Sequence, residues 1–407
     1  MEGSTIVIKH RYIWDTLGKE LNTREALVIT GARQTGKSTT LKWLLEQVES
    51  DNKLFLDLTL QSTRDLFENY DAEGILLALK GRGLDFSQRT YIAIDEIQYS
   101  KRVPMVVKYL VDHYHIKFFL SGSSAYYLKN HFSESMAGRK LVFELFPLSF
   151  QEYLDFKNLD FVLPNFFEVL QNKDGVTFDS YLYNSISRHY EEYINFGGFP
   201  AVVLESDFER KKQRLDEIFT SYIDLDVEHL ADFRSIGDLR KVIALLAARV
   251  GSKINVNDFS VITGLSRPTI QSYMEFLEKT YLVRFLPVTS KSNDVKTRKQ
   301  AKVYFIDTGI AVRNADLSGG NKFENTLCHQ LQRYGKLGYY DQKGEVDFVL
   351  ERSNSDYFAF EAKESPVPSH LKSLVTRSAQ LNPQAVALIG RNSSEKFKQY
   401  LWGGMIA

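Results

Sequence analysis

Eight residues near the N-terminus have the types and spacing of a phosphate-binding loop. The segment GARQTGKS, residues 31–38, matches the pattern G-x-x-x-x-G-K-S/T between an apolar stretch and a helix-length stretch. Glycines let backbone N–H groups wrap phosphate oxygens at a helix N-terminus, where the helix dipole favours negative charge. Lys37 is expected to reach the β- and γ-phosphates, and Ser38 to ligate Mg²⁺. The sequence therefore predicts a site for ATP and Mg²⁺. Its expected contact residues are Gly31, Ala32, Arg33, Gln34, Thr35, Gly36, Lys37, Ser38 and Thr39.

Two carboxylates directly follow a later apolar stretch, YIAIDE, residues 91–96. Asp95 is expected to hold Mg²⁺ through water, and Glu96 to orient or deprotonate the attacking water. A further apolar stretch ends in FFLSGSS, so Ser121 or Ser123 could sense the γ-phosphate. Simple turn formation is an equal alternative for these serines. Together with the loop, the acidic pair predicts ATP hydrolysis.

Two arginines have open assignments. Arg139, in MAGRK, is either a trans-acting arginine finger or a sensor of nucleotide state, with a plain surface arginine as the alternative. Arg33 lies inside the loop and contacts either phosphate or solvent. The prediction of ATP hydrolysis depends on neither residue.

A second group of chemical residues lies near the C-terminus. KFENTLCHQLQRY places Glu324 on an amphipathic helix, and KGEVDFVLE places Asp347 on a strand. FAFEAKE puts Glu361 and Lys363 on the next strand, where a period of two makes them share a face. Such carboxylates can bind one or two Mg²⁺ or Mn²⁺ ions and activate water for phosphodiester cleavage, with the lysine stabilising the developing charge. The expected metal ligands here are Glu324, Asp347 and Glu361. A charged strand pair with solvated faces is the alternative.

Alternation of apolar and helix-length stretches organises the first part of the chain. The apolar stretches cover residues 27–30, 53–58, 91–96 and 117–122. Continuous apolar strands between helices predict a parallel sheet covered on both faces, which is an α/β fold. After FELFPLSFQEYL the sequence is mostly helical and rich in aromatic residues, with a break at GGFP. That pattern predicts a helical subdomain.

A helix, turn and helix followed by a strand are predicted over residues 238–286. In the turn ITGLSRPT, Gly264 permits a sharp bend and Ser266 can cap the second helix. If this is a DNA-binding helix-turn-helix, the second helix presents its first polar residues to base edges. Those residues are Arg267, Thr269, Gln271 and Ser272. Phosphate contacts are expected from Lys279, Arg284, Lys291 and the basic run through Arg298 and Lys302. A packing or protein-interaction module is the alternative. Residues 290–302 are the best candidate for a linker or wing.

Composition limits the function classes. A chain of 407 residues is too long for one ordinary core and predicts two or three domains. Lys plus Arg and Asp plus Glu both number 51, so net charge gives no general attraction to nucleic acid. The single cysteine, Cys328, excludes an internal disulfide. No apolar stretch approaches the roughly 20 residues of a membrane span, and no signal-peptide core is present, so we expect a cytoplasmic protein.

Five segments in this order resemble a family of prokaryotic AAA-type ATPases that carry a C-terminal domain of unknown function. They are GARQTGKS, IDEIQ, FLSGSS, AGRKLVFELFPLSFQEYL and FGGFP. The resemblance implies a P-loop core with an additional strand (residues 1–145), a helical lid (146–235), a winged helix (236–300) and a nuclease-like fold (301–407). The layout of the last part also resembles the restriction-endonuclease-like superfamily, which includes Holliday-junction resolvases.

Two functions follow as hypotheses, and both include ATP hydrolysis. In the first, ATP regulates an enzyme that binds branched or double-stranded DNA and cuts it with Mg²⁺ or Mn²⁺. In the second, ATP drives a signalling switch whose C-terminal domain is an inactive protein-interaction module. A sequence-specific regulator that uses only the winged helix is a weaker third. The sequence leaves the oligomeric state open.

Overall fold

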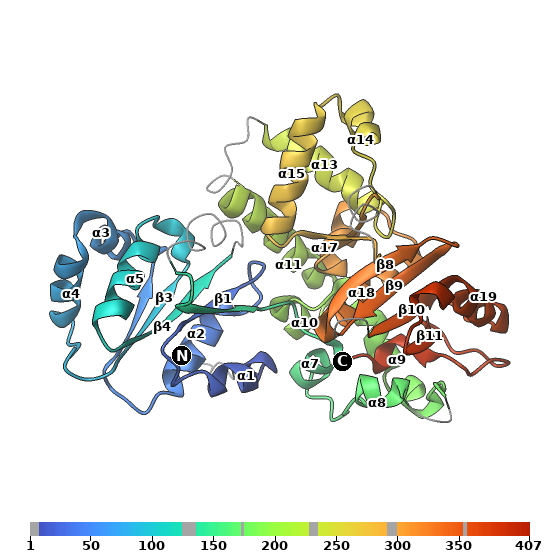
Figure 1. Cartoon of the computed structure of the whole chain (residues 1–407), viewed down its shortest axis with the longest axis horizontal. Helices are drawn as coiled ribbons and strands as arrows, with labels where there is room; N and C mark the ends of the chain where they lie inside the picture. Colours follow the sequence, from blue (N-terminus) through green and yellow to red (C-terminus); the bar gives the residue numbers. More distant parts are fainter. Residues whose placement is uncertain (1–7, 124–135, 172–174, 228–234, 291–298, 353–355) are drawn as a thin grey trace. The chain divides into compact units, whose positions relative to one another are not determined.

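The computed structural model describes residues 8–123, 136–171, 175–227, 235–290, 299–352 and 356–407. They belong to two compact units, each described by itself below (Figure 1). The N-terminal unit comprises Met1–Phe146, Asp224–Asp232 and Lys279–Tyr281. The C-terminal unit comprises Pro147–Ile223, Phe233–Glu278 and Leu282–Ala407. The chain therefore enters the N-terminal unit three times.

The N-terminal unit is built on a five-stranded sheet in the order β2-β3-β4-β1-β5. All neighbouring strands pair in parallel, which confirms the predicted α/β fold with a parallel sheet. The strands are β1 (Ala26–Thr30), β2 (Lys53–Asp57), β3 (Thr90–Asp95), β4 (Ile116–Gly122) and β5 (Lys140–Glu144). Strands β2 and β5 lie at the two edges and are only partly buried, whereas β1, β3 and β4 between them are buried throughout.

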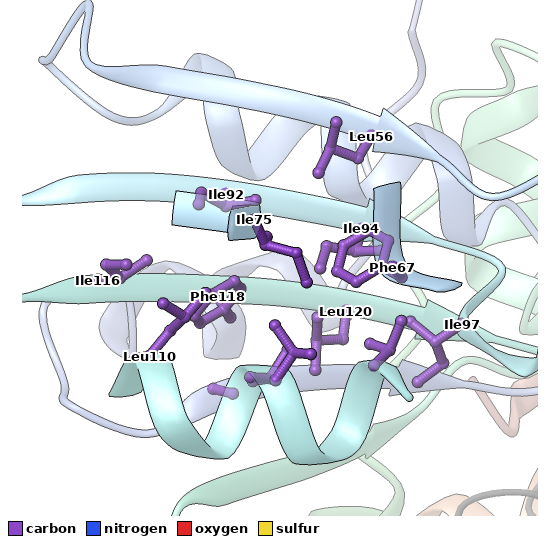
Figure 2. Packing of buried hydrophobic residues seen from close by; sticks show 14 of the residues in the cluster. Leu56, Phe67, Ile75, Ile92, Ile94, Ile97, Leu110, Ile116, Phe118 and Leu120 are labelled. Atoms are coloured by element: carbon purple, nitrogen blue, oxygen red, sulfur yellow. The ribbon is translucent and has the colours of Figure 1, made fainter. Parts of the chain in front are cut away.

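Helices cover both faces of this sheet, because alternate residues of each central strand point to opposite sides. They are α1 (Ile13–Lys19), α2 (Lys37–Glu46), α3 (Gln61–Asn69), α4 (Ala72–Lys80) and α5 (Val103–His113). On one face, α3, α4 and α5 pack on a cluster that Figure 2 shows from close by, with Leu56, Ile92, Ile94, Phe118 and Leu120 from three strands. On the other face, α1 and α2 pack on a cluster that includes Leu27, Ile29 and Phe119.

Parallel pairing brings the carboxyl ends of these strands to one edge of the sheet. Strand β4 lies between β1 and β3, with Ile29 paired to Ser121 and Ile94 paired to Leu120. The loop that follows β1, the end of β3 and the end of β4 therefore share that edge. In open α/β sheets this is the edge where ligands bind.

The C-terminal unit begins with helices and ends with a mixed sheet. Its first helices are α7 (Phe150–Phe156), α8 (Phe166–Leu170), α9 (Ser180–Phe196), α10 (Pro200–Leu204) and α11 (Phe208–Ser221). Next come α13 (Ile236–Ala248), α14 (Val256–Thr263), α15 (Arg267–Lys279) and the antiparallel pair β6 (Val283–Leu286) and β7 (Lys302–Phe305). Helices α17 (Thr308–Asn314) and α18 (Gly319–Leu331) follow. The helical stretch predicted after FELFPLSFQEYL is therefore present.

The mixed sheet has the order β12-β11-β10-β9-β8. Strands β8 (Lys336–Asp341), β9 (Glu345–Glu351) and β10 (Tyr357–Lys363) pair antiparallel, whereas β10, β11 (Ala385–Gly390) and β12 (Leu401–Trp402) pair in parallel. Helix α19 (Pro368–Ser378) connects β10 to β11. The strand, helix, strands, helix, strand order predicted after Lys302 is present.

Aromatic residues fill the core of the C-terminal unit. Tyr153, Tyr190, Tyr193 and Trp402 are each at most 2% exposed. Phe150 stacks at 5.6 Å on Tyr153. The abundance of Phe and Tyr in this part of the chain is therefore explained by packing.

The GGFP break has a steric cause. Gly197 has φ +75°, and a Cβ there would lie 2.0 Å from Oδ1 of Asp307. A Cβ at Gly198 would lie 2.4 Å from the carbonyl oxygen of Leu148. Both positions therefore need glycine, because the backbone passes against buried neighbours. Within the part of the chain that the structure describes, no helix combines the length and apolarity needed to cross a bilayer.

Candidate nucleotide site and carboxylate cluster

The loop between β1 and α2 has three residues with positive φ, two of which are glycines. Gly31 has φ +144°, and a Cβ there would lie 2.2 Å from the carbonyl oxygen of Leu145. Gly36, which precedes α2, has φ +101°. Gln34 also has positive φ, at +60°. These conformations turn the chain sharply from strand to helix, which leaves the helix N-terminus open at the carboxyl edge of the sheet.

Lys37 folds back over this loop. Its Nζ donates to the carbonyl oxygens of Gly31 at 3.0 Å and Ala32 at 2.8 Å, and the side chain is buried. Burial lowers the pKa of Lys37 below its ordinary value. The ammonium therefore lies at the loop, bonded to backbone oxygens that a phosphate oxygen can replace.

Asp95 is buried at the end of β3, beside two hydroxyls. Ser121 Oγ donates to Asp95 Oδ1, and the Ser38 hydroxyl lies close to the Asp95 carboxylate. Burial raises the pKa of Asp95, and the hydroxyls of Ser121 and Ser38 oppose that rise. Mg²⁺ prefers oxygen ligands, and a carboxylate beside a loop hydroxyl is the donor set predicted for it. The residues present therefore fit Mg²⁺.

Glu96 has a backbone conformation that few residues adopt. Its φ is +55°, in the left-handed region, which costs a non-glycine residue about 1–3 kcal/mol. Its N–H donates to Asp95 Oδ1 at 3.1 Å and to Ser121 Oγ at 3.2 Å. The Gln98 amide donates to the Glu96 carboxylate. Strain held in this way is typical of functional sites and aims the Glu96 side chain differently from a regular strand residue.

Sequence reasoning missed a buried aspartate that joins this group. Asp226 Oδ2 pairs with Arg33 Nε at 2.8 Å, and Asp226 Oδ1 accepts from Ser123 Oγ at 2.7 Å. Asp226 is 0% exposed. Arg33, expected to touch phosphate or solvent, therefore has a carboxylate partner. An aspartate on the apolar side of the segment YIDLDV is the one sequence signal that could have indicated it.

Arg11 was also missed. It is 5% exposed and donates through Nη1 to the carbonyl oxygen of Thr35 at 2.7 Å and through Nη2 to that of Phe146 at 2.8 Å. The Thr35 hydroxyl in turn donates to the carbonyl oxygen of Ala32 at 2.9 Å. These bonds fix the middle of the loop. Nothing in the spacing of Arg11 relative to the loop motif indicates this role.

The structure does not bring Arg139 to the loop of its own chain. The N–H of Ala26, the first residue of β1, donates to the Arg139 carbonyl, and Lys140 pairs with Ala26. The loop follows Thr30 at the other end of β1. Arg139 pairs instead with Asp112 at 2.6 Å. A sensor of nucleotide bound to the same chain therefore does not fit this position, and the trans-acting finger stays a prediction.

The second predicted group lies on three elements of the C-terminal unit: Glu324 on α18, Asp347 on β9, and Glu361 with Lys363 on β10. The backbone N–H of Ala362 donates to Asp347 Oδ2 at 3.0 Å. Burial first, then the carboxylates of Glu324 and Glu361, raise the pKa of Asp347. The fold therefore brings the predicted carboxylates close enough to repel one another.

Lys302, the first residue of β7, lies among these carboxylates. Its Nζ is 2.6 Å from Glu345 Oε1, 3.4 Å from Glu324 Oε1 and 3.7 Å from Asp347 Oδ1. The side chain is 2% exposed. The prediction that Lys302 contacts DNA phosphate is therefore wrong, because its charge is buried in an ion-pair network.

Ion pairs neutralise the whole cluster. Glu361 pairs with Lys363 at 2.8 Å and with Arg377 at 3.0 Å. Among the described residues a separate network links four carboxylates, Glu324, Asp341, Glu345 and Asp347, with three lysines, Lys253, Lys299 and Lys302. A divalent ion needs carboxylate oxygens whose charge is not already balanced. Within the residues that the structure describes, no group of three His, Cys, Asp or Glu residues is arranged to hold a metal ion. The predicted ligands Glu324, Asp347 and Glu361 therefore do not fit a divalent metal as placed.

The predicted helix-turn-helix corresponds to α14, a turn and α15. Gly264 ends α14 with φ +73°, and the Ser266 hydroxyl accepts from the N–H of Thr269 at 3.3 Å. On α15 the residues Ile270, Tyr273, Met274 and Leu277 are buried, whereas Arg267, Gln271 and Ser272 are exposed and Thr269 is half-buried. The wing candidate at 291–298, with Lys291 and Arg298, lies outside the described residues.

Residues 23–154 match the family model of an AAA domain. This match supports an AAA-type P-loop ATPase. A second model, a domain of unknown function (DUF8612), matches residues 187–320. The AAA domain match ends within α7, so it contains the loop, Asp95, Glu96 and Ser121, but not Asp226 or the carboxylate cluster.

Comparison with whole proteins finds relatives of similar length. An uncharacterized protein of Haemophilus influenzae is 27% identical over 369 residues, which cover 84% of each chain. An uncharacterized protein of Methanocaldococcus jannaschii is 27% identical over 344 residues, covering 81% of this chain and 73% of the relative. Among solved structures, the Walker-type ATPase PABY2304 of Pyrococcus abyssi is 17% identical and covers 75% of this chain and 96% of its own, with a TM-score of 0.46.

Proposed function

We propose that the protein binds and hydrolyses Mg²⁺-ATP at the carboxyl edge of the N-terminal sheet. The observation that carries this proposal is the buried Asp95 carboxylate at the end of β3. It accepts from the Ser121 hydroxyl and lies close to Ser38, at the start of α2. Bound Mg²⁺ would neutralise charge on the phosphates. Lys37 would bind the phosphates, and Ser38 and Asp95 would hold the ion. Glu96 would orient or deprotonate the attacking water.

The test is ATP turnover by the purified full chain, together with nucleotide affinity by calorimetry. We expect Lys37→Ala to lose both ATP affinity and at least about 100-fold of turnover, because the ammonium is the main phosphate contact of such loops. Lys42→Ala is the matched control, since Lys42 is exposed on the same helix. Affinity and turnover that survive in Lys37→Ala would overturn the proposal.

We further propose that the C-terminal unit binds DNA through α15. The supporting observation is the exposed polar start of this helix, after a glycine turn and before the antiparallel pair β6 and β7, which is the order of elements in a winged helix. Residues 236–300 would form that winged helix and residues 146–235 a helical lid. The expected partners are double-stranded or branched DNA, contacted by Arg267 and Gln271.

DNA binding is tested by fluorescence anisotropy on duplex and four-way branched DNA at several salt concentrations. Arg267→Ala with Gln271→Ala should weaken binding by at least 10-fold, the loss expected for side chains on base edges. Lys372→Ala, an exposed lysine of α19, is the control. Binding unchanged in the double variant would favour the signalling switch, in which the unit contacts protein.

For residues 301–407 we propose a restriction-endonuclease-like fold that does not cleave DNA. Lys302 supports this proposal, because its ammonium group pairs with Glu324 and Asp347, two of the carboxylates that a metal would need as ligands. The test is incubation of the protein with linear, branched and single-stranded DNA and Mg²⁺ or Mn²⁺, with and without ATP. We expect no cleavage. Cleavage that is lost in Asp347→Ala would restore the nuclease hypothesis.

A further inference from the structure

Asp226 divides its two carboxylate oxygens between two parts of the candidate ATP site. One oxygen is paired at 2.8 Å with Nε of Arg33, in the phosphate-binding loop. The other accepts at 2.7 Å from Oγ of Ser123, directly after β4. Asp226 is 0% exposed, so both partners compensate a charge that has left water. A buried carboxylate bonded in this way holds both partners, Arg33 and Ser123, in place.

The Ser123 bond continues toward Glu96. Because the Ser123 hydroxyl donates to Asp226, its oxygen is left to accept, and it accepts from the Gln98 amide at 3.0 Å. The same amide nitrogen donates to the Glu96 carboxylate. Each step has a defined donor and acceptor, and the direction of the whole chain is set by the ionised Asp226. An asparagine at 226 has one acceptor oxygen in place of two, so it cannot accept from both Ser123 and Arg33.

Asp226 reaches the site from a distant part of the sequence. It lies on the π-helical segment Tyr222–Val227, which continues from α11. The boundary between the two units falls inside this segment, after Ile223. The residues that hold Arg33 and Glu96 are therefore joined covalently, within a few residues, to a helix of the other unit.

We infer that Asp226 is a positioning residue for ATP hydrolysis, which holds Arg33 directly and Glu96 through Ser123 and Gln98. This inference rests on the proposed ATPase function. It also assigns a route of control, because any shift of the segment Tyr222–Val227 changes the loop arginine and the glutamate that faces water together. ATP binding needs the loop itself, whereas hydrolysis needs Glu96 in place. Asp226 should therefore affect turnover more than affinity.

The experiment compares Asp226→Asn with Asp224→Asn in the full chain. Asparagine keeps the shape of the side chain and removes its charge, and Asp224 is an exposed aspartate of the same segment. We expect Asp226→Asn to lower kcat for ATP by at least 10-fold and to change KM less than threefold. Asp224→Asn should leave both unchanged. Thermal unfolding of each variant identifies loss of folding.

A double-mutant cycle with Arg33→Gln tests the pair. If Asp226 acts partly through Arg33, the loss of kcat in the double variant should be smaller than the product of the two single losses. Fully multiplied effects would overturn the inference, as would Asp226→Asn with kcat within twofold of wild type. If Asp226→Asn does not fold, Ser123→Ala carries the same expectation of a kcat loss with little change in KM, and an unchanged kcat there would overturn it.

The outcomes also separate this inference from the function on which it rests. Wild-type protein that shows no turnover sensitive to Lys37→Ala overturns both. Turnover that is lost in Lys37→Ala and kept in Asp226→Asn overturns the positioning role alone.

Discussion

The molecule buries acidic groups at two sites that share the same residue types, and compensates them differently. At the end of β3, Asp95 and Glu96 lie beside neutral groups, the hydroxyls of Ser38 and Ser121 and the amide of Gln98. Around β9 and β10, the carboxylates are paired with lysines and an arginine. Hydroxyls and amides orient a carboxylate without cancelling its charge, so the first site still attracts a cation. Ammonium groups cancel it.

Burial alone does not separate the two sites. It raises the pKa of Asp95 in one and of Asp347 in the other. The difference lies in the nearest cation: at the second site Lys302 Nζ is within 3.7 Å of three carboxylates. A pattern of acidic residues on strands therefore predicts where carboxylates lie together. The groups that pair with those carboxylates determine whether a metal ion is needed to balance their charge.

The largest effect that would test this comparison is expected from Glu96→Gln. The change keeps the size of the side chain and removes the carboxylate that we propose orients or deprotonates the attacking water. We expect kcat for ATP to fall by about 10³-fold, within the usual contribution of such a group, and ATP affinity to persist. Steady-state turnover with calorimetry on the same samples measures both.

Gln98→Ala serves as the comparison variant, because Gln98 holds the Glu96 carboxylate and is not proposed to act on water itself. It should lose less turnover than Glu96→Gln. Equal activity of Glu96→Gln and wild type would mean that this carboxylate does not act on water and would weaken the contrast between the two sites.

A smaller effect is expected from Lys302→Met, which removes the internal cation and keeps the length of the side chain. Breaking a buried ion pair usually costs about 3–5 kcal/mol, and because Glu345 is part-exposed we expect about 3 kcal/mol less stability in urea unfolding. The freed carboxylates should now accept a metal, so millimolar Mn²⁺ should raise the Tm of this variant only.

Lys336→Met, at a lysine of β8 whose side chain is exposed to 71%, is the matched control. It should neither lose stability in urea nor gain Tm with Mn²⁺. Wild-type protein stabilised by Mn²⁺ through the C-terminal unit would contradict the assignment of Lys302 as the internal cation.

The parts of the site that sequence predicts are those whose partners are local. The loop at residues 31–38 and the acid that ends β3 follow from strand, turn and helix patterns, and parallel pairing then brings them to one edge. Asp226 could not be placed in this way, since it is 103 residues from its partner Ser123. Lys302 belongs to a basic run in the sequence. Nothing in such a run distinguishes a lysine exposed to water from a lysine buried among carboxylates.

The smallest expected effect concerns Asp307, a buried carboxylate that contrasts with Asp226 because backbone N–H groups hold it. It accepts from Gly198 at 2.7 Å and from Gly309 at 2.9 Å. Burial raises the pKa of Asp307 to about 6, against the effect of these bonds. Between its ordinary pKa of about 3.9 and pH 6, the native state keeps a proton that the unfolded state has lost. The stability from this proton is complete below about pH 4 and is lost as pH rises through 6.

Asp307→Asn isolates this contribution, because asparagine does not titrate. The variant should be less stable than wild type at pH 4.5, since its amide group meets a backbone N–H in place of an acceptor. The difference in free energy of unfolding between wild type and variant should then narrow by up to about 1.4 kcal/mol per pH unit toward pH 6, because wild type loses the stability that the Asp307 proton contributes. Urea unfolding at half-unit pH steps measures the gap. Asp179→Asn, at the N-cap of α9, is the control for the same substitution at a helix cap, where asparagine caps about as well as aspartate. A stability gap that widens toward pH 6 would mean that the pKa of Asp307 is lower in the folded protein than in the unfolded chain. The backbone N–H donors would then lower this pKa more than burial raises it.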